Sequence, residues 1–153
     1  MVATQHVSRF FSLDPVPLNR QKRERHKKPL VQDKYVILCV DDEQNSLALR
    51  KLVLEKSGYE VVTASSVNEA LGKFSPDEFD LVLSDILMPG RPGTDLAREI
   101  KTTYPDFPVV LLSGVNELPP DASYADAFIS KVEGPIRMCE KISAVLNGHR
   151  DSL

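Results

Sequence analysis

The sequence contains no tryptophan and only two cysteines, and both shortages exclude classes of function. Aromatic residues make up 7% of the chain, too few for the stacking platform on which single-stranded nucleic acids bind. Cys39 and Cys139 lie far apart in the sequence, each within an apolar pattern. We therefore expect two buried free thiols rather than a disulfide framework or a metal site.

Long apolar runs are also missing from the 153 residues. No stretch approaches the roughly 20 apolar residues that span a bilayer, and the N-terminus lacks the continuous apolar segment of a secretory signal. We therefore expect a cytoplasmic protein without membrane insertion. Hydrophobic residues make up 42% and charged residues 27%, the balance of an ordinary globular domain with a short tail.

Charge is distributed unevenly along the chain. Residues 1–34 hold eight basic and three acidic residues, net +5, whereas residues 35–153 carry a net charge of −8. The basic part includes the run from Arg20 to Lys28 and few core-forming residues, so we expect residues 1–34 to form a mostly disordered tail. Such a run binds nucleic acid weakly at most, and a solvated leader is the simpler interpretation.

From residue 35 onward, short apolar runs alternate with helix-length amphipathic segments. Expected strands cover residues 35–40, 60–64, 79–84, 108–112 and 126–130, and expected helices cover 44–57, 66–74, 95–103 and 135–147. Nearly all-apolar strands separated by helices predict an α/β protein whose parallel sheet is covered on both faces. Right-handed crossovers favour a flavodoxin-like, doubly wound five-stranded sheet of order 2-1-3-4-5 over residues 35–148, followed by a short C-terminal tail, 149–153.

Local signals suggest where the helices begin and end. Ser66 to Glu69 has the pattern of a capping box, and Gly58 and Gly148 are suited to follow the ends of the first and last helices. In the first helix, the apolar residues expected to be available for burial are Leu47, Leu49, Leu52 and Val53.

Polar residues break the apolar pattern where the strands end. Asp41 and Asp42 follow the first strand, and Asp85, Ser113 and Lys131 follow the third, fourth and fifth strands. In the order 2-1-3-4-5 these strands are consecutive neighbours, so the five side chains converge on one rim of the sheet. Lys131 alone cannot neutralise three carboxylates, and oxygen ligands favour Mg²⁺. The sequence therefore predicts a Mg²⁺ site at this rim.

These motifs resemble those of response-regulator receiver domains, the phosphorylatable half of bacterial two-component systems. The resemblance covers about residues 35–148 and rests on Val40–Glu43, Leu83–Gly93, Leu112–Gly114 and Phe128–Lys131. It implies that Asp85 is the phosphoacceptor, which attacks the phosphorus of a phosphohistidine on a sensor histidine kinase or phosphotransfer protein. The product would be an acyl phosphate.

The resemblance also implies how the charges are handled. Mg²⁺ would be held by the carboxylates of Asp42 and Asp85 and by the backbone carbonyl of Leu87, with Asp41 acting through water. The ion and Lys131 would offset charge on the transferred phosphoryl oxygens.

A switch is implied as well. Ser113 would hydrogen-bond a phosphoryl oxygen, and Gly114 would leave room for its approach. Inward movement of Ser113 would vacate space for Phe128 to rotate, which changes a protein-binding surface. The alternative for Phe128 is a plain core aromatic residue.

The chain departs from the family pattern in three places. Val132 follows Lys131 where receivers usually place a proline. The interval from Ser113 to Lys131 is a few residues short, and Pro119-Pro120 would break a helix there, so we expect the fourth helix to be short or missing. Finally, apolar Leu87 and Val115 flank the expected approach of attacking water, which predicts slow self-dephosphorylation.

Several interpretations stay open. Nothing after Asn147 resembles an output domain, so we expect a stand-alone phosphoacceptor that signals by binding an unidentified protein. It would not be a metabolic enzyme, since self-phosphorylation from small donors and slow self-dephosphorylation are incidental to signalling. One alternative is a receiver-like binding module that is not phosphorylated. Another is an Asp-nucleophile Mg²⁺ phosphatase of the haloacid-dehalogenase type, although that family places Asp-x-Asp after its first strand and this chain has Asp41-Asp42-Glu43.

Overall fold

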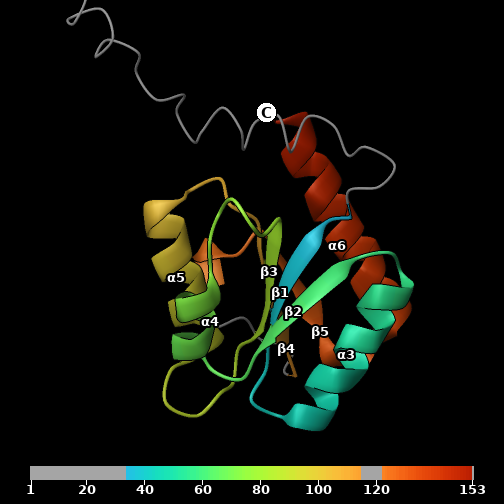
Figure 1. Ribbon diagram of the computed structural model, residues 1–153, viewed down its shortest axis with the longest axis horizontal. Helices are drawn as coiled ribbons and strands as arrows, with labels where there is room; N and C mark the ends of the chain where they lie inside the picture. Colours follow the sequence, from blue (N-terminus) through green and yellow to red (C-terminus); the bar gives the residue numbers. More distant parts are fainter. Residues whose placement is uncertain (1–33, 115–121, 153) are drawn as a thin grey trace, which may run out of the picture.

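Five parallel strands form the centre of the molecule (Figure 1). The computed structural model describes residues 34–114 and 122–152. Its strands are paired in the order β2-β1-β3-β4-β5, which confirms the predicted doubly wound, flavodoxin-like sheet. Their bounds are β1 (Val36–Val40), β2 (Glu60–Ala64), β3 (Leu81–Asp85), β4 (Val109–Ser113) and β5 (Ala127–Ser130).

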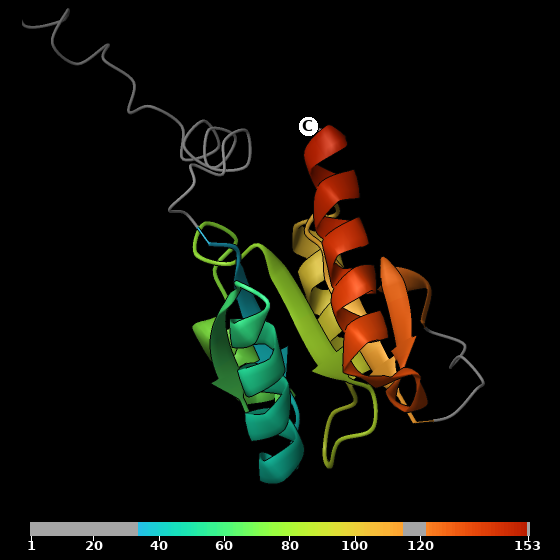
Figure 2. The same cartoon turned by 90° about the vertical axis from the view of Figure 1, so that its right-hand side faces the viewer.

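Two pairs of helices cover the two faces of the sheet. One face carries α4 and α5, and the other carries α3 and α6, which lie side by side in Figure 2. Their bounds are α3 (Gln44–Lys56), α4 (Val67–Lys73), α5 (Gly93–Thr103) and α6 (Gly134–Asp151). No helix in the described part of the chain is long and apolar enough to cross a membrane.

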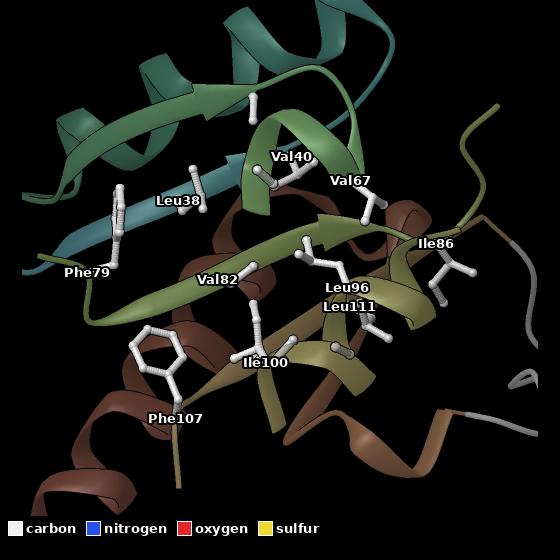
Figure 3. Packing of buried hydrophobic residues seen from close by; sticks show 14 residues of the cluster. Leu38, Val40, Val67, Phe79, Val82, Ile86, Leu96, Ile100, Phe107 and Leu111 are labelled. Carbon is white, nitrogen blue, oxygen red and sulfur yellow. The ribbon is translucent and has the colours of Figure 1, made fainter. Parts of the chain in front are cut away.

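Alternation along the strands builds a hydrophobic core on each face. In β1, Leu38 and Val40 point toward α4 and α5, whereas Ile37 and Cys39 point toward α3 and α6. Figure 3 shows the first of these cores, where side chains from the sheet meet helical residues such as Leu96. Because both faces are buried, the sheet is a rigid platform that fixes the residues at its strand ends.

The connection between β4 and β5 fits the expected shortening of the fourth helix. Within its described residues, the helical element is a single 3₁₀ turn, η1 (Ala122–Tyr124). Pro119, Pro120 and Val115 lie outside the described residues.

Two predictions about helices were wrong. The last helix does not end before Gly148 but continues to Asp151, so residues 149–151 of the expected tail are helical. Gly148 does not have the positive φ that would end a helix, and His149 and Arg150 suit the negative end of the helix dipole. In α3, Leu49 is 63% exposed and Leu52 is also exposed, although both were expected to be available for burial.

Geometry explains the error in α3. Leu47 and Leu54 are the buried residues of this helix, seven positions and about two turns apart on one face. Leu49 lies about 200° around the axis from Leu47 and therefore points away from the sheet.

Strand ends differ from the predictions by one or two residues, with one consequence for the site. β3 begins at Leu81 rather than Phe79, and its last residue is Asp85, while β4 ends with Ser113. Backbone pairing within the sheet therefore fixes the positions of Asp85 and Ser113.

The two cysteines differ in burial. Cys139 is only half-buried, so just one of the two thiols, that of Cys39, is buried as predicted.

Candidate functional site

Three carboxylates meet at the carboxyl edge of the sheet. Oxygen atoms from Asp41, Asp42 and Asp85 lie within 4.8 Å of one another, a grouping able to hold a metal ion. Asp41 follows β1 and Asp85 ends β3, its hydrogen-bonded neighbour, so adjacent strands bring them together. Asp41 and Asp85 are buried and Asp42 is exposed. Carboxylates at this spacing repel one another unless a cation joins them.

Lys131 reaches the same cluster from the end of β5. Its Nζ donates a hydrogen bond to Asp85 Oδ2 at 2.8 Å, which pairs a partly exposed ammonium with a buried carboxylate. Burial raises the pKa of the Asp85 carboxyl, and Lys131 lowers that pKa in part. The sequence prediction that Lys131 joins Asp85 at the rim agrees with this contact.

Arg50 also reaches the cluster, and sequence reasoning missed it. Its Nη1 donates to Asp41 Oδ2 at 2.9 Å, and the two side chains are only 10% and 1% exposed. The other Asp41 oxygen, Oδ1, accepts the backbone N–H of Glu43 at 3.0 Å. A signal was present in the sequence: Arg50 stands three residues after Leu47 and four before Leu54, on the buried face of α3.

The end of β4 brings Ser113 to the next position along the rim. Asp85 is paired with Leu112 in the β3–β4 ladder, so Ser113 lies one residue beyond it on the neighbouring strand. Ser113 is buried, and a Cβ placed on the following Gly114 would meet no atom of the described residues within 4 Å. Among the described residues, space is thus available beside Ser113 on this edge.

Phe128 lies on the same sheet face as Ser113. Leu111 is paired with Phe128 and Ser113 with Ser130, so the serine and the aromatic ring are diagonal neighbours across β4 and β5. Phe128 is half-buried and packs against the core beneath α4 and α5.

The loop from β3 to α5 is closed tightly behind Asp85. The N–H of Gly93 donates to the carbonyl of Ile86 at 2.8 Å, and a Cβ on Gly93 would stand 2.0 Å from the carbonyl oxygen of Asp85. Only glycine permits this approach. Leu87, at the start of the loop, has a 68% exposed side chain.

Arg91 ties the same loop to two helices. Its guanidinium donates to Asn68 of α4 at 3.1 Å and to the carboxylates of Asp95 and Glu99 of α5. These contacts hold the segment that carries the Leu87 carbonyl.

The residue after Lys131 also has a defined local structure. Lys131 opens a 3₁₀ turn, η2 (Lys131–Glu133), and the N–H of Val132 donates to Ser130 Oγ at 3.4 Å. Proline has no N–H, so this bond depends on the departure from the family pattern. The Val132 side chain is 82% exposed.

Comparison with known proteins gives a consistent result. The family model of the response regulator receiver domain matches residues 37–143 of this chain. The alkaline phosphatase synthesis transcriptional regulatory protein PhoP of Bacillus subtilis is 36% identical over 81 residues, which are 53% of this chain and 34% of that protein. The match therefore spans about a third of the length of this relative.

Solved structures agree with the family match. The response regulator TrrA of Thermotoga maritima, in complex with Mg²⁺-BeF, is 35% identical, with a TM-score of 0.69 over 72% of this chain and 98% of that one. TrrA in complex with the histidine kinase ThkA gives 36% identity and a TM-score of 0.68, over 73% and 98% of the two chains. A CheY-like receiver domain protein from Methanospirillum hungatei is 31% identical, with a TM-score of 0.72 over 79% of this chain and 100% of that one. With the rim geometry described above, these matches show that the chain belongs to the response regulator receiver domain family, whose members are phosphoacceptor signalling modules.

Proposed function

We propose that Asp85 is the residue that receives the phosphoryl group in this chain. An Asp85 oxygen would attack the phosphorus of a phosphohistidine, forming the O–P bond of an acyl phosphate as the N–P bond breaks and the imidazole leaves. The observation that carries the proposal is the contact of Lys131 Nζ with Asp85 Oδ2 at 2.8 Å, beside two further carboxylates. Lys131 would then offset charge on the phosphoryl oxygens. The protein would act as a phosphoacceptor and not as an enzyme that turns over a substrate.

The donor set fits Mg²⁺, a hard cation that prefers carboxylate and carbonyl oxygens. We propose that Asp42, Asp85 and the Leu87 carbonyl hold the ion directly. Both oxygens of Asp41 already accept hydrogen bonds, from Glu43 N–H and from Arg50, which supports the prediction that Asp41 acts through water. When bound, the ion would supply positive charge to the phosphoryl oxygens.

Ser113 and Phe128 would convert phosphorylation into a surface change. Ser113 would hydrogen-bond a phosphoryl oxygen, with Gly114 leaving space for the group. The diagonal placement of Ser113 and Phe128 on one face supports a coupled movement, because a shift of the serine changes the room beside the ring. Slow self-dephosphorylation, set by the apolar Leu87 and Val115, stays a prediction, as does the cytoplasmic location.

A histidine kinase or phosphotransfer protein is the proposed phosphodonor, as the complex of TrrA with ThkA suggests. Three exposed apolar side chains support a docking face near Lys131: Leu49 of α3 at 63% exposure, Val132 at 82% and Ile136 of α6 at 77%. Leu49→Asp should slow transfer from a protein donor and leave phosphorylation by a small phosphodonor unchanged. The downstream target would be a protein that prefers the phosphorylated form.

Beryllofluoride, a phosphoryl mimic, tests the site without a kinase. We expect it to raise the melting temperature of the wild-type protein only when Mg²⁺ is present, and to have no effect on Asp85→Asn. Asp106→Asn is the matched control, because it removes a carboxylate that precedes β4 at the opposite edge of the sheet. Equal effects on the wild type and Asp85→Asn, or none on the wild type, would count against Asp85 as the phosphoacceptor.

A further inference from the structure

The acidic site already contains a cation that is not explained by phosphoryl transfer. Arg50 donates to Asp41 Oδ2 at 2.9 Å, and this ion pair is almost completely buried. A guanidinium keeps its charge at every accessible pH, so the positive charge is permanent. Leu47 and Leu54 anchor the helix on either side of Arg50, which fixes the arginine over the site.

The charges of the contacting groups show what Arg50 does to the metal-free site. Three carboxylates meet there, and Lys131 and Arg50 each pair with one of them, which leaves one net negative charge. Without Arg50 the same groups would carry two. Since Asp41 is 1% exposed, water cannot replace the guanidinium effectively, and its carboxylate would be left as an unpaired buried charge.

The same charge must oppose a second cation. Arg50 occupies one oxygen of Asp41 and places a positive charge beside the region where Asp42 and Asp85 would hold Mg²⁺. Repulsion between cations is stronger in a partly buried site than in water, because the effective dielectric constant is lower.

We propose that Arg50 is a built-in counter-ion that stabilises the metal-free site and sets a weak affinity for Mg²⁺. The inference rests on the proposed Mg²⁺ site and goes beyond it, because it assigns a residue that regulates how readily that site fills. Phosphorylation, which needs the ion, would then follow the free Mg²⁺ concentration over a higher range than in a site without Arg50.

Calorimetric titration of the full chain with Mg²⁺ tests the proposal. Arg50→Met removes the charge and keeps an unbranched, flexible side chain, although a shorter one, and we expect it to bind Mg²⁺ at least about tenfold more tightly. Lys51→Met is the matched control, because it removes the same charge from the next residue of α3, which is 45% exposed and pairs with Glu55 instead. We expect the affinity of Lys51→Met to match that of the wild type.

A second measurement separates this role from a purely structural one. Without Mg²⁺, Arg50→Met should melt at a lower temperature than the wild type, and saturating Mg²⁺ should remove most of the difference. If Arg50→Met does not fold, Arg50→Gln, which keeps a polar group without the charge, replaces it in both measurements.

The outcomes distinguish this inference from the proposed function. Equal or weaker Mg²⁺ binding by the Arg50 variant, with normal binding by the wild type, overturns the counter-ion and leaves the Mg²⁺ site intact. Absence of binding in both proteins overturns the Mg²⁺ site and the inference together. Tighter binding by Lys51→Met as well would overturn the inference, because the effect would then come from net charge alone.

Discussion

Single residues at the carboxyl edge are constrained by very short distances. Gly93 is the clearest case, because a Cβ there would stand 2.0 Å from the carbonyl oxygen of Asp85 and 2.9 Å from Ser84 Oγ. The loop that carries the site closes only over a residue without a side chain.

Gly93→Ala should therefore destabilise the protein by at least about 2 kcal/mol, because backbone must move to relieve the overlap. Gly72→Ala is the control, since it lies in α4 with open space around its Cβ and should stabilise the fold by about 0.5–1 kcal/mol. Urea denaturation measures both. Equal effects of the two substitutions would show that the loop adjusts without cost.

The two cysteines should differ in reactivity. Cys39 is buried and its pKa is raised to about 11, so at pH 8 it has almost no thiolate, the reactive form. Cys139 is half-buried, with its Sγ 3.3 Å from Ser57 Oγ. Mass spectrometry after alkylation at pH 8 should find one label per folded chain, at Cys139. A label at Cys39 that appears as fast would contradict the described packing.

How far single residues could be predicted depended on where they stand. Asp41, Asp85 and Lys131 each interrupt or follow an apolar strand, so the strand order alone brought them together. Arg50 was missed because a cation in a helix is normally solvated, although its spacing from Leu47 and Leu54 places it on the buried face of α3, from which its long side chain reaches Asp41.

Helices show what local sequence signals decide. Ser66 caps α4 as predicted, since its Oγ accepts the N–H of Glu69 at 3.0 Å. The reciprocal bond of a capping box is shifted by one residue, because the Glu69 carboxylate accepts from Ser65 N–H and Oγ instead. These contacts lower the pKa of Glu69 to about 2.

Ser66→Ala should cost about 1 kcal/mol of unfolding free energy, the usual value of an N-cap side chain. Ser66→Asp keeps an acceptor at the same position and should stay close to the wild type. Thermal denaturation of the three proteins near neutral pH provides the comparison. If both variants lose the same stability, the Ser66 hydroxyl does not act as the cap.

Helix ends and faces were the weaker part of the prediction. α6 passes through Gly148 because glycine permits a helix end without enforcing one, and the basic residues His149 and Arg150, which favour the negative end of a helix dipole, follow it. Leu49 and Leu52 were expected to be buried, yet the sheet contacts only the face of α3 that bears Leu47 and Leu54. The apolar character of a residue did not reveal whether the sheet covers it or leaves it exposed.

At the scale of the molecule, strand order was the most predictable feature. Five apolar segments separated by helices allow few right-handed arrangements, and the order 2-1-3-4-5 then places the ends of β1, β3, β4 and β5 beside one another. The site follows from that topology, because the acidic cluster and Lys131 meet at one edge of a sheet that is buried on both faces.

The central claim is that this edge accepts a phosphoryl group at Asp85. Intact mass after incubation with a small phosphodonor and Mg²⁺ tests it most directly, with Asp85→Asn and Asp106→Asn treated in parallel. We predict one added phosphoryl group on the wild type and on Asp106→Asn, none without Mg²⁺ and none on Asp85→Asn. A folded wild-type protein that binds Mg²⁺ and beryllofluoride but gains no mass, or an Asp85→Asn protein that gains it equally, would contradict the claim.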